Sequence, residues 1–294
     1  VLPPPSLFGQ YKRQEDLELI RTALIGLGFD EVYEVAAAAE LVSDATRRLM
    51  EQGALKGPVI SSACPAVLRL IRIRFPNLLD NVLPLLPPME VAARLARAKA
   101  VEETGLKPEE IGIAFLTPCP AKVTSVKNPM GTEKSSVDLA ISVSDVSPAL
   151  LASMNKCAER GVGPDHSQSG RTGLSWGNSG GEAAATFTMR YLAADGIENV
   201  INVLEQMEDE KLADQDFVEL NACPAGCVGG VLNIENPYVA VTRMKHLRDY
   251  RPVACNHIQG EKLPTELPWD APVEPITALR LDPSPMKAMQ KMQR

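Results

Sequence analysis

Residues 217–230 read FVELNACPAGCVGG and decide how the rest of the chain is interpreted. The run from Phe217 to Asn221 is short and mostly apolar, as a strand of a covered sheet should be, and two cysteines four residues apart follow it, Cys223 and Cys227. In open α/β sheets, ligands bind in the crevice beyond the carboxyl ends of the strands. The stretch therefore predicts a buried strand that delivers two thiols to a site at the edge of a sheet.

Two more cysteines share this context. Cys64 lies in SSACPAV after the apolar run 58–62, and Cys119 lies in LTPCPAK after the run 111–117. Proline follows each of them, as it follows Cys223, and it fixes the turn and removes a backbone donor. Four thiols delivered from three distant points of the chain indicate one metal site that the fold assembles.

Apolar runs and helical periodicity alternate along the chain. We expect strands at 31–35, 58–62, 111–117, 138–143, 198–204 and 217–221, and helices at 15–28, 36–52, 65–74, 89–104, 147–160 and 182–194. This order is typical of βαβ units. The predicted fold class is α/β, with two lobes, each a mainly parallel β-sheet flanked by helices, and with the metal cluster in the cleft between them.

The domain limits follow from composition. We expect one domain over residues 1–262, with its N-terminal segment lining the cleft. Lobe one would cover roughly 30–145 and supply Cys64 and Cys119, and lobe two would cover roughly 146–260 and supply Cys223 and Cys227. Residues 263–294 are proline-rich and are interpreted as a strap or linker. A start at valine indicates a piece of a longer polypeptide.

Bulk composition excludes several function classes. A net charge of −7 argues against a nucleic-acid surface, for which a basic stripe is expected. No apolar stretch reaches the roughly 18 residues of a membrane span. Six cysteines in 294 residues form no disulfide framework, which favours reduced thiols and a cytoplasmic protein.

The cysteine pattern by itself leaves three interpretations open. A 4Fe–4S cluster requires four thiolates and often has proline after its cysteines. Structural zinc sites usually have two close pairs, whereas this chain has one pair and two distant cysteines. Buried free cysteines without a ligand are the third interpretation. Cys157 and Cys255 lack the strand-end context and receive no role.

At these motifs the chain resembles the catalytic domain of iron-only (FeFe) hydrogenases. SSACPAV, TPCPAKVTS and NACPAGCVGG match the three cysteine motifs of that family in order and spacing, and the resemblance runs from about Pro4 to about His257. It implies an H-cluster, in which a 4Fe–4S cluster is joined to a diiron subsite that carries CO, CN and a bridging dithiolate. The ligands it implies are Cys64, Cys119, Cys223 and, bridging to the diiron subsite, Cys227.

The resemblance also implies which residues line the diiron pocket. Lys122 matches the lysine that holds one cyanide, and Pro5-Ser6 matches a Pro-Ser pair of the pocket. The stretch WGNSGG, which begins with Trp176 and Gly177, matches a Phe-Gly-x-Thr-Gly-Gly stretch near the cluster. Its glycines allow the backbone to come close to an anionic cofactor.

Departures from the family pattern affect proton transfer. Ala63 stands where efficient members have a proton-shuttling cysteine, and alanine carries no proton. The other relay positions are occupied by Leu83, Asp44 and Arg47. Thr117 and Asn221 replace two methionines near the cluster, and Ser125 replaces a glutamate. The sensory subgroup of the family also has alanine at the relay position, so the resemblance is closest to that subgroup.

The resulting expectation is slow, reversible oxidation of dihydrogen to protons and electrons, used for hydrogen sensing. No cysteine set remains for a second cluster, so electrons would require an external iron–sulfur carrier or domain. PAS or kinase signalling domains are the partners that the sensory resemblance implies. The alternative is a related iron–sulfur protein that holds only a 4Fe–4S cluster and lacks hydrogenase activity.

Overall fold

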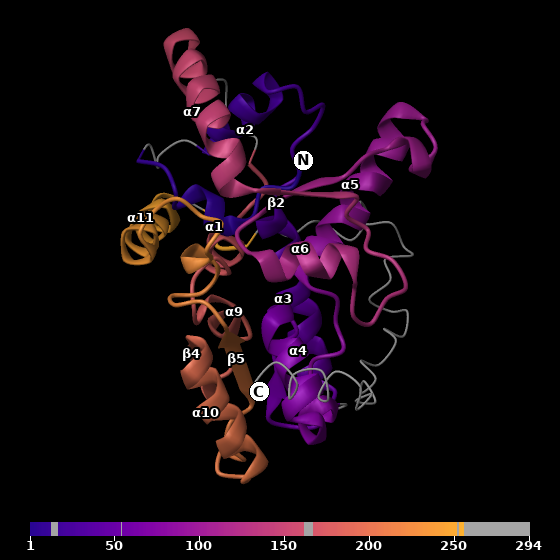
Figure 1. Ribbon diagram of the computed structural model, residues 1–294, viewed down its shortest axis with the longest axis vertical. Coiled ribbons are helices and arrows are strands. Elements are labelled where there is room, and N and C mark those ends of the chain that lie inside the picture. Colours follow the sequence, from indigo (N-terminus) through magenta and orange to yellow (C-terminus); the bar gives the residue numbers. More distant parts are fainter. Residues whose placement is uncertain (13–16, 54, 162–166, 252, 256–294) are drawn as a thin grey trace, which may run out of the picture.

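Two parallel sheets form the framework of the molecule (Figure 1). The computed structural model describes residues 1–12, 17–53, 55–161, 167–251 and 253–255. One sheet has the strand order β1-β5-β4, and the other pairs β2 with β3. The strands are β1 (Val59–Ile60), β2 (Ala114–Thr117), β3 (Leu139–Ser142), β4 (Tyr191–Asp195) and β5 (Phe217–Asn221). Parallel sheets flanked by helices confirm the predicted α/β class.

Helices connect and cover these strands. The α-helices are α1 (Pro5–Phe8), α2 (Leu17–Gly26), α3 (Val35–Glu51), α4 (Pro65–Arg74), α5 (Pro88–Thr104), α6 (Pro120–Lys127), α7 (Val143–Arg160), α8 (Arg171–Ser175), α9 (Gly181–Ala185), α10 (Ile197–Glu208) and α11 (Pro237–Tyr250). The 3₁₀ turns are η1 (Pro76–Asn81), η2 (Pro108–Glu110) and η3 (Cys227–Gly229). Proline is the first helical residue of α4 and of α6. The backbone N–H at this position has no acceptor within the helix, so its absence in proline costs no helical hydrogen bond.

The register of the three-stranded sheet brings the cysteine segments together. Val59 lies beside Phe217 in β5, and Tyr191 lies beside the same Phe217 from the other side. Because both pairings are parallel, all three strands end at one edge of the sheet. Cys64 therefore leaves the same sheet as Cys223, and only Cys119 leaves the β2–β3 sheet. The expectation that Cys64 and Cys119 come from one lobe is wrong, because β1 pairs with β5 and not with β2.

The first residues of the chain extend the smaller sheet. Leu2 N donates to Ala114 O at 2.8 Å and Leu116 N donates to Leu2 O at 3.1 Å, so Leu2 bridges to β2 in parallel. Val35 N donates to Pro3 O at 3.1 Å. The predicted strand at 31–35 is wrong: this segment is extended and bonded to the N-terminus, but α3 begins at Val35.

Two further predictions around β4 are wrong. The helix expected over 182–194 ends at Ala185, and β4 follows because pairing with β5 overrides the helix propensity of its alanines. The strand expected over 198–204 is the helix α10, and Val200, Leu204 and Met207 are its buried residues. Their spacing is helical, and the β-branched residues between them do not override it.

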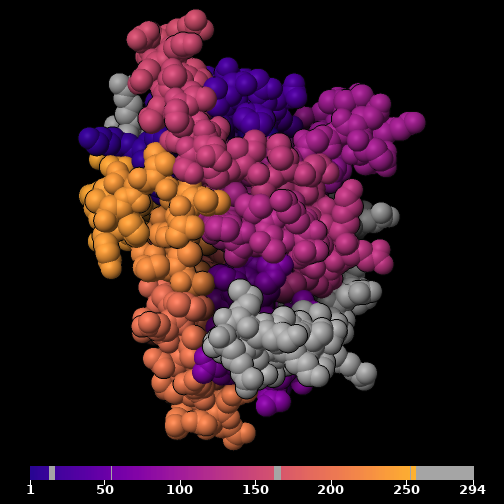
Figure 2. Space-filling view, in the orientation of Figure 1, coloured from indigo at the N-terminus to yellow at the C-terminus, as the bar shows by residue number. Residues whose placement is uncertain are grey.

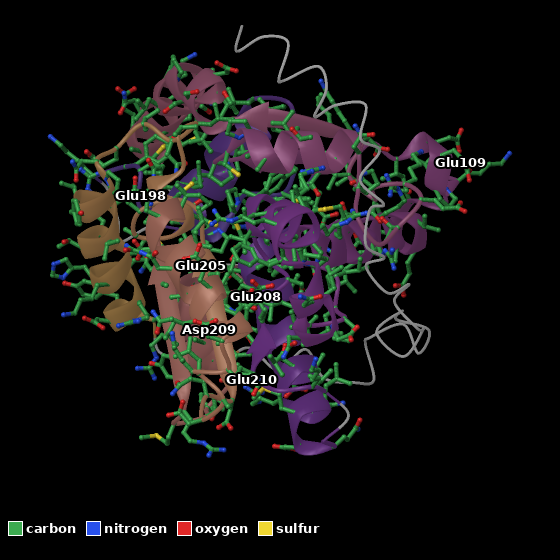
Figure 3. The ribbon with its side chains drawn as sticks, turned by 60° about the horizontal axis from the view of Figure 1, so that its bottom comes forward. Glu109, Glu198, Glu205, Glu208, Asp209 and Glu210 are labelled. Carbon is green, nitrogen blue, oxygen red and sulfur yellow. The ribbon has the colours of Figure 1, made fainter. Side chains whose placement is uncertain are left out.

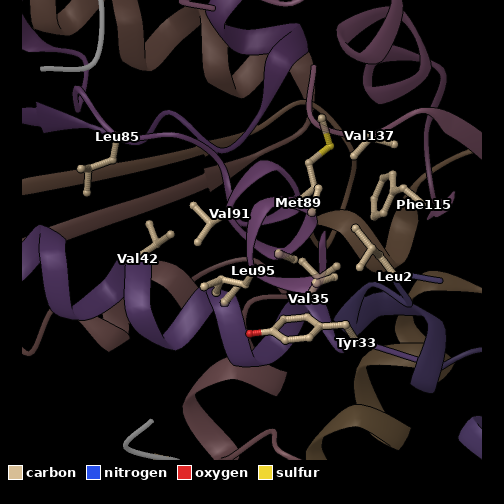
Figure 4. Packing of buried hydrophobic residues seen from close by; sticks show 14 of the residues in the cluster. Leu2, Tyr33, Val35, Val42, Leu85, Met89, Val91, Leu95, Phe115 and Val137 are labelled. Carbon is tan, nitrogen blue, oxygen red and sulfur yellow. The ribbon is translucent and has the colours of Figure 1, made fainter. Parts of the chain in front are cut away.

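Apolar packing fixes the sheets against their helices. One cluster joins Leu2 and Phe115 of the smaller sheet to Val35, Met89 and Leu95 of α3 and α5 (Figure 4). Another cluster lies between β5, α4 and α10 and includes the fully buried Ile60 and Ile71.

A side-chain cap decides where α7 begins. The helix predicted over 147–160 begins earlier, at Val143, because Ser142 Oγ accepts from Asp145 N at 3.0 Å and caps it.

No helix among the described residues is long and apolar enough to cross a bilayer. The proline-rich strap or linker predicted over 263–294 lies outside the described residues.

Candidate metal centre

The cysteine segments leave their strands in the same way. Cys64 is the residue before α4 and Cys119 is the residue before α6, both with extended backbone. A thiolate at either place lies at the positive end of a helix dipole, which favours the charged form. The local sequence Cys-Pro therefore sets both the helix start and the environment of the sulfur.

All four strand-end thiols lie within electrostatic reach of one another. Burial and the charges of Cys119, Cys227 and Cys64, in that order, raise the pKa of the Cys223 thiol to about 12. Such mutual repulsion requires a cationic ligand if the thiols are to ionise together. Among the described residues no three His, Cys, Asp or Glu side chains are grouped tightly enough to hold a single ion. The four thiols therefore lie near one another without the close grouping of a single-ion site.

Lys122 is the cation nearest these thiols. Its Nζ donates to Cys227 Sγ at 3.6 Å. Burial lowers the pKa of Lys122, but the charges of Cys227, Cys119 and Cys64 outweigh burial, and the net shift is upward. A cavity of about 30 Å³ is lined by Lys122 and Ala63. The sequence predicted that both residues belong to the metal centre, and in the structure both line the same cavity.

Ser6 supplies a buried donor with no acceptor. It lies in α1, the residue is 0% exposed, and its Oγ has no hydrogen-bond partner in the described part of the chain. An unpaired buried hydroxyl is costly, on the order of 1–3 kcal/mol, so it indicates a missing ligand. Lys122, a cation, and Ser6, a buried hydroxyl, are the kinds of donor that an anionic ligand such as cyanide would require.

The glycine-rich stretch lies against the Cys223–Cys227 turn. Val228 N donates to Gly177 O at 3.0 Å, and Ser179 N donates to Ala225 O at 3.0 Å. A Cβ atom at Gly177 would lie 3.1 Å from Ser6 N, so this glycine lets α1 approach the turn. Trp176 itself points elsewhere: its Nε1 donates to Ser43 Oγ in α3 at 2.9 Å.

The Cys119 segment is joined to the same turn. Leu232 N donates to Pro118 O at 3.0 Å, and a Cβ atom at Gly230 would lie 2.3 Å from that oxygen. Thr117 Oγ1 donates to Cys119 O at 3.0 Å and accepts from Cys119 N at 3.3 Å. Thr117 therefore orients the cysteine backbone in place of the methionine of the family pattern.

Sequence reasoning missed two buried carboxyls behind the centre. Ser61 Oγ donates to Glu182 Oε2 at 2.6 Å and accepts from Ala63 N at 3.1 Å, which links Glu182 to the Cys64 segment. Glu219 accepts from Gly180 N at 2.9 Å, from Ala183 N at 2.8 Å and from Asn221 Nδ2 at 2.7 Å. The sequence offered one signal for these buried carboxyls: Glu219 is a charged residue inside the mostly apolar run 217–221.

Both carboxyls have raised pKa values, mainly because they are buried. The charge of Glu219 raises the pKa of Glu182 further, while the bond from Ser61 and the charge of Lys122 lower it. Asn221, which is predicted to line the cofactor, donates to Glu219. These carboxyls connect the ends of β1 and β5 to the start of α9.

The family's relay positions hold no chain of proton carriers among the described residues. Leu83 is 1% exposed and its backbone bonds to Ile60 O at 2.8 Å. Arg47 binds Asp44 at 2.6 Å and also donates to Ala185 O at 3.0 Å. An apolar side chain and a closed ion pair occupy the positions where the resemblance places serine and glutamates.

Comparison with known proteins gives the family. The family model described as "Iron only hydrogenase large subunit, C-terminal domain" matches residues 5–193 and 182–231. This chain belongs to that family. The NADP-reducing hydrogenase subunit HndD of Solidesulfovibrio fructosivorans is 23% identical in an alignment 263 residues long, and the match covers 71% of this chain and 44% of that protein. The chain thus spans less than half the length of this relative.

Other relatives are matched over shorter segments. Iron hydrogenase 1 of Clostridium pasteurianum is 24% identical over 115 residues, 37% of this chain and 20% of that protein. A probable cytosolic Fe-S cluster assembly factor of Drosophila sechellia is 38% identical over 42 residues, 14% of this chain and 9% of that protein. Apo FeFe-hydrogenase HydA1 from Chlamydomonas reinhardtii shares the fold, with a TM-score of 0.67, 17% identity and coverage of 94% of this chain and 93% of that one.

Gly226→Ala should disrupt the centre. Gly226 has φ +86, and a Cβ atom there would lie 2.5 Å from Ser179 N and 2.8 Å from Asn178 C, so the Cys223–Cys227 turn would separate from the glycine-rich stretch. We expect at least a tenfold drop in the affinity for iron and sulfide during anaerobic reconstitution, measured as bound iron per chain.

The matched control is Gly105→Ala. Gly105 has φ +70 and ends α5, and a Cβ atom there would have no described neighbour within 4 Å. In this variant the added Cβ atom causes only the left-handed backbone strain, about 1–2 kcal/mol, and no collision with a neighbouring residue. Equal iron content in Gly226→Ala and Gly105→Ala would show that the close approach at Gly226 is unimportant.

Glu182→Gln should change how stability depends on pH. The pKa of Glu182 is higher in the folded protein than in the unfolded chain, so the folded state binds more protons above the ordinary carboxyl range. Its contribution is fully present at low pH and is lost as pH rises through the raised pKa. Between about pH 6 and about pH 9, the free energy of unfolding should therefore fall less in the variant than in the parent, measured by urea titration. A larger fall in the variant would contradict this sign.

Proposed function

We propose that this domain binds an H-cluster and carries out slow, reversible oxidation of dihydrogen, and that the reaction serves to sense hydrogen. The observation that carries the proposal is a pair of donors: Lys122, which bonds to Cys227, and the unpartnered Ser6 of α1, which packs on η3, the turn that begins at Cys227. A 4Fe–4S cluster alone would satisfy the thiols but would leave the buried Ser6 hydroxyl without an acceptor. Anionic ligands on a diiron subsite would give it one.

Within this proposal each residue has a definite task. The 4Fe–4S cluster would be held by Cys64, Cys119, Cys223 and Cys227, as the family motifs imply. Lys122 and Ser6 would donate to the anionic ligands of the diiron subsite, and Gly177 would admit the backbone of α1 beside it. When bound, the H-cluster supplies the metal centre at which dihydrogen is converted reversibly into protons and electrons.

The proposed slow rate rests on the family's relay positions, the first of which is Ala63. Its methyl group carries no proton, Leu83 is apolar, and Asp44 is bound to Arg47. Loss of a positioned acid–base group costs roughly 10²- to 10⁴-fold in rate. A centre that binds and slowly turns over dihydrogen suits a sensor, in which the bound state is the signal. An external iron–sulfur carrier or domain would exchange the electrons, and signalling domains of the PAS or kinase type would be partners of a cytoplasmic protein.

The similarity to a probable cytosolic Fe-S cluster assembly factor favours a second candidate. That match covers only 42 residues of a protein named for Fe-S cluster assembly. The second candidate is an iron–sulfur protein that holds a 4Fe–4S cluster and no diiron group. The two candidates differ in one measurable property, which is whether metal-bound carbonyl and cyanide are present.

Infrared spectroscopy of the reconstituted protein tests the proposal. After anaerobic assembly of the 4Fe–4S cluster and addition of a diiron cofactor, we expect sharp carbonyl and cyanide bands that shift under dihydrogen. Ser6→Ala should shift the cyanide bands, because it removes a donor to that ligand. A brown protein with a cubane but without these bands would support the cluster-only candidate.

Ala63→Cys alone should not restore fast turnover. The other relay positions would still be occupied by Leu83 and by the Asp44–Arg47 pair, which do not pass a proton onward. We expect hydrogen oxidation with an artificial electron acceptor to rise less than about tenfold, well short of the factor that a complete relay supplies. A gain of about 10³-fold or more would show that another route already reaches Ala63.

A further inference from the structure

A cationic groove lies on the outer side of the glycine-rich stretch. It has a volume of about 490 Å³ and is formed by α8, residues 178–181, α9, β4 and α11. In Figures 1 and 2, α11 lies above the β4 region along one edge of the molecule. The volume is within the range of about 300–1,000 Å³ typical of small-molecule sites.

Three basic residues line the groove, and no acidic residue does. They are Arg171 at the start of α8 and Lys245 and Arg248 of α11, and none of them forms an ion pair with a described residue. Arg248 Nη1 donates to Ser175 Oγ at 3.3 Å, which fixes its guanidinium beside α8. In a chain of net charge −7, a groove whose charged lining residues are all cationic is selective for anions.

The donors available to a ligand are side chains and not backbone amides. Gly180 N is occupied by Glu219 at 2.9 Å, and Gly181 N donates to Asn178 O at 3.1 Å. Guanidinium groups bind phosphate in a bidentate manner and lysine binds it as a point charge. The arginine and lysine side chains of the groove therefore favour a phosphate ligand over a carboxylate that backbone amides at a helix N-terminus would bind.

Two exposed aromatic side chains border the groove. Phe187 is 67% exposed. Its backbone is left-handed, with φ +59, a conformation that costs a bulky residue about 1–3 kcal/mol. Tyr191 is 39% exposed at the start of β4. An aromatic face beside cations suits a ligand that has both a ring and phosphate groups.

The surrounding surface disfavours an acidic protein as the occupant. α10 packs on β4, and Glu198, Glu205, Glu208, Asp209 and Glu210 lie along it and just past its end (Figure 3). A protein interface would cover about 800 Å² per partner and would meet these carboxylates, whereas a small anion inside the groove would not.

We propose that this cationic groove binds a small phosphate-bearing molecule through Arg171, Lys245 and Arg248. The ligand would lie behind residues 178–181, whose inner side contacts the Cys223–Cys227 turn through the bond from Ser179 N to Ala225 O at 3.0 Å. Binding would thus stabilise the wall of the metal centre from outside. The inference does not depend on the proposed function.

Calorimetric titration of the full chain, without added metal, tests the site with two probes, ADP and pyrophosphate. We expect both to bind at physiological salt, and Lys245→Gln with Arg248→Gln to weaken binding at least tenfold, as loss of charge-assisted bonds implies. Tighter binding of ADP than of pyrophosphate would assign the site to nucleotides, and equal binding would assign it to inorganic phosphates.

The matched control is Lys156→Gln with Arg160→Gln on α7, which removes the same charge away from the groove. Lys245→Arg keeps the charge and should retain affinity, and a cooperative thermal transition checks the fold of each variant. Absence of binding by both probes, or an equal loss in the α7 variant, would overturn the proposal.

Discussion

The metal centre depends on the hydrogen bonds that are accepted by the buried carboxylate of Glu219. It lies on β5, the central strand, and it accepts from Gly180 N, Ala183 N and Asn221 Nδ2. A buried charge with too few donors costs several kcal/mol, and bonds to a charged group contribute about 1.5–3 kcal/mol each. These bonds hold the start of α9 at the end of β5, and thereby hold the glycine-rich stretch against the Cys223–Cys227 turn.

The remaining walls of the centre follow from this arrangement. β1 lies beside β5, so the Cys64 segment ends at the same sheet edge, and Ser61 joins it to Glu182 on α9. Pro118 O accepts from Leu232 N and so attaches the second sheet to the segment that follows Cys227. Each wall is fixed by backbone or buried side-chain bonds, so the fold itself holds the thiol-bearing segments in place.

The centre retains donors for anions and lacks a route for protons through the described relay positions. Lys122 and Ser6 are in place, whereas Ala63, Leu83 and the Asp44–Arg47 pair occupy those positions. The buried carboxyls of Glu182 and Glu219 are engaged in holding loops. This division between binding and turnover is the structural basis for proposing a sensor within the iron-only hydrogenase family.

The sequence by itself determined the α/β class, the strand β5 and the position of each thiol after a strand, because these depend on short apolar runs and on Cys-Pro, which act locally. The family resemblance also predicted that the glycine-rich stretch lies near the cluster. Only the tertiary structure decided that Cys64 shares a sheet with Cys223, that residues 191–195 form a strand, and that Asn221 and Trp176 bond to Glu219 and Ser43. Strand order and the partners of buried polar groups depend on contacts between segments that are distant in the sequence. Local periodicity does not specify which of these segments will be in contact.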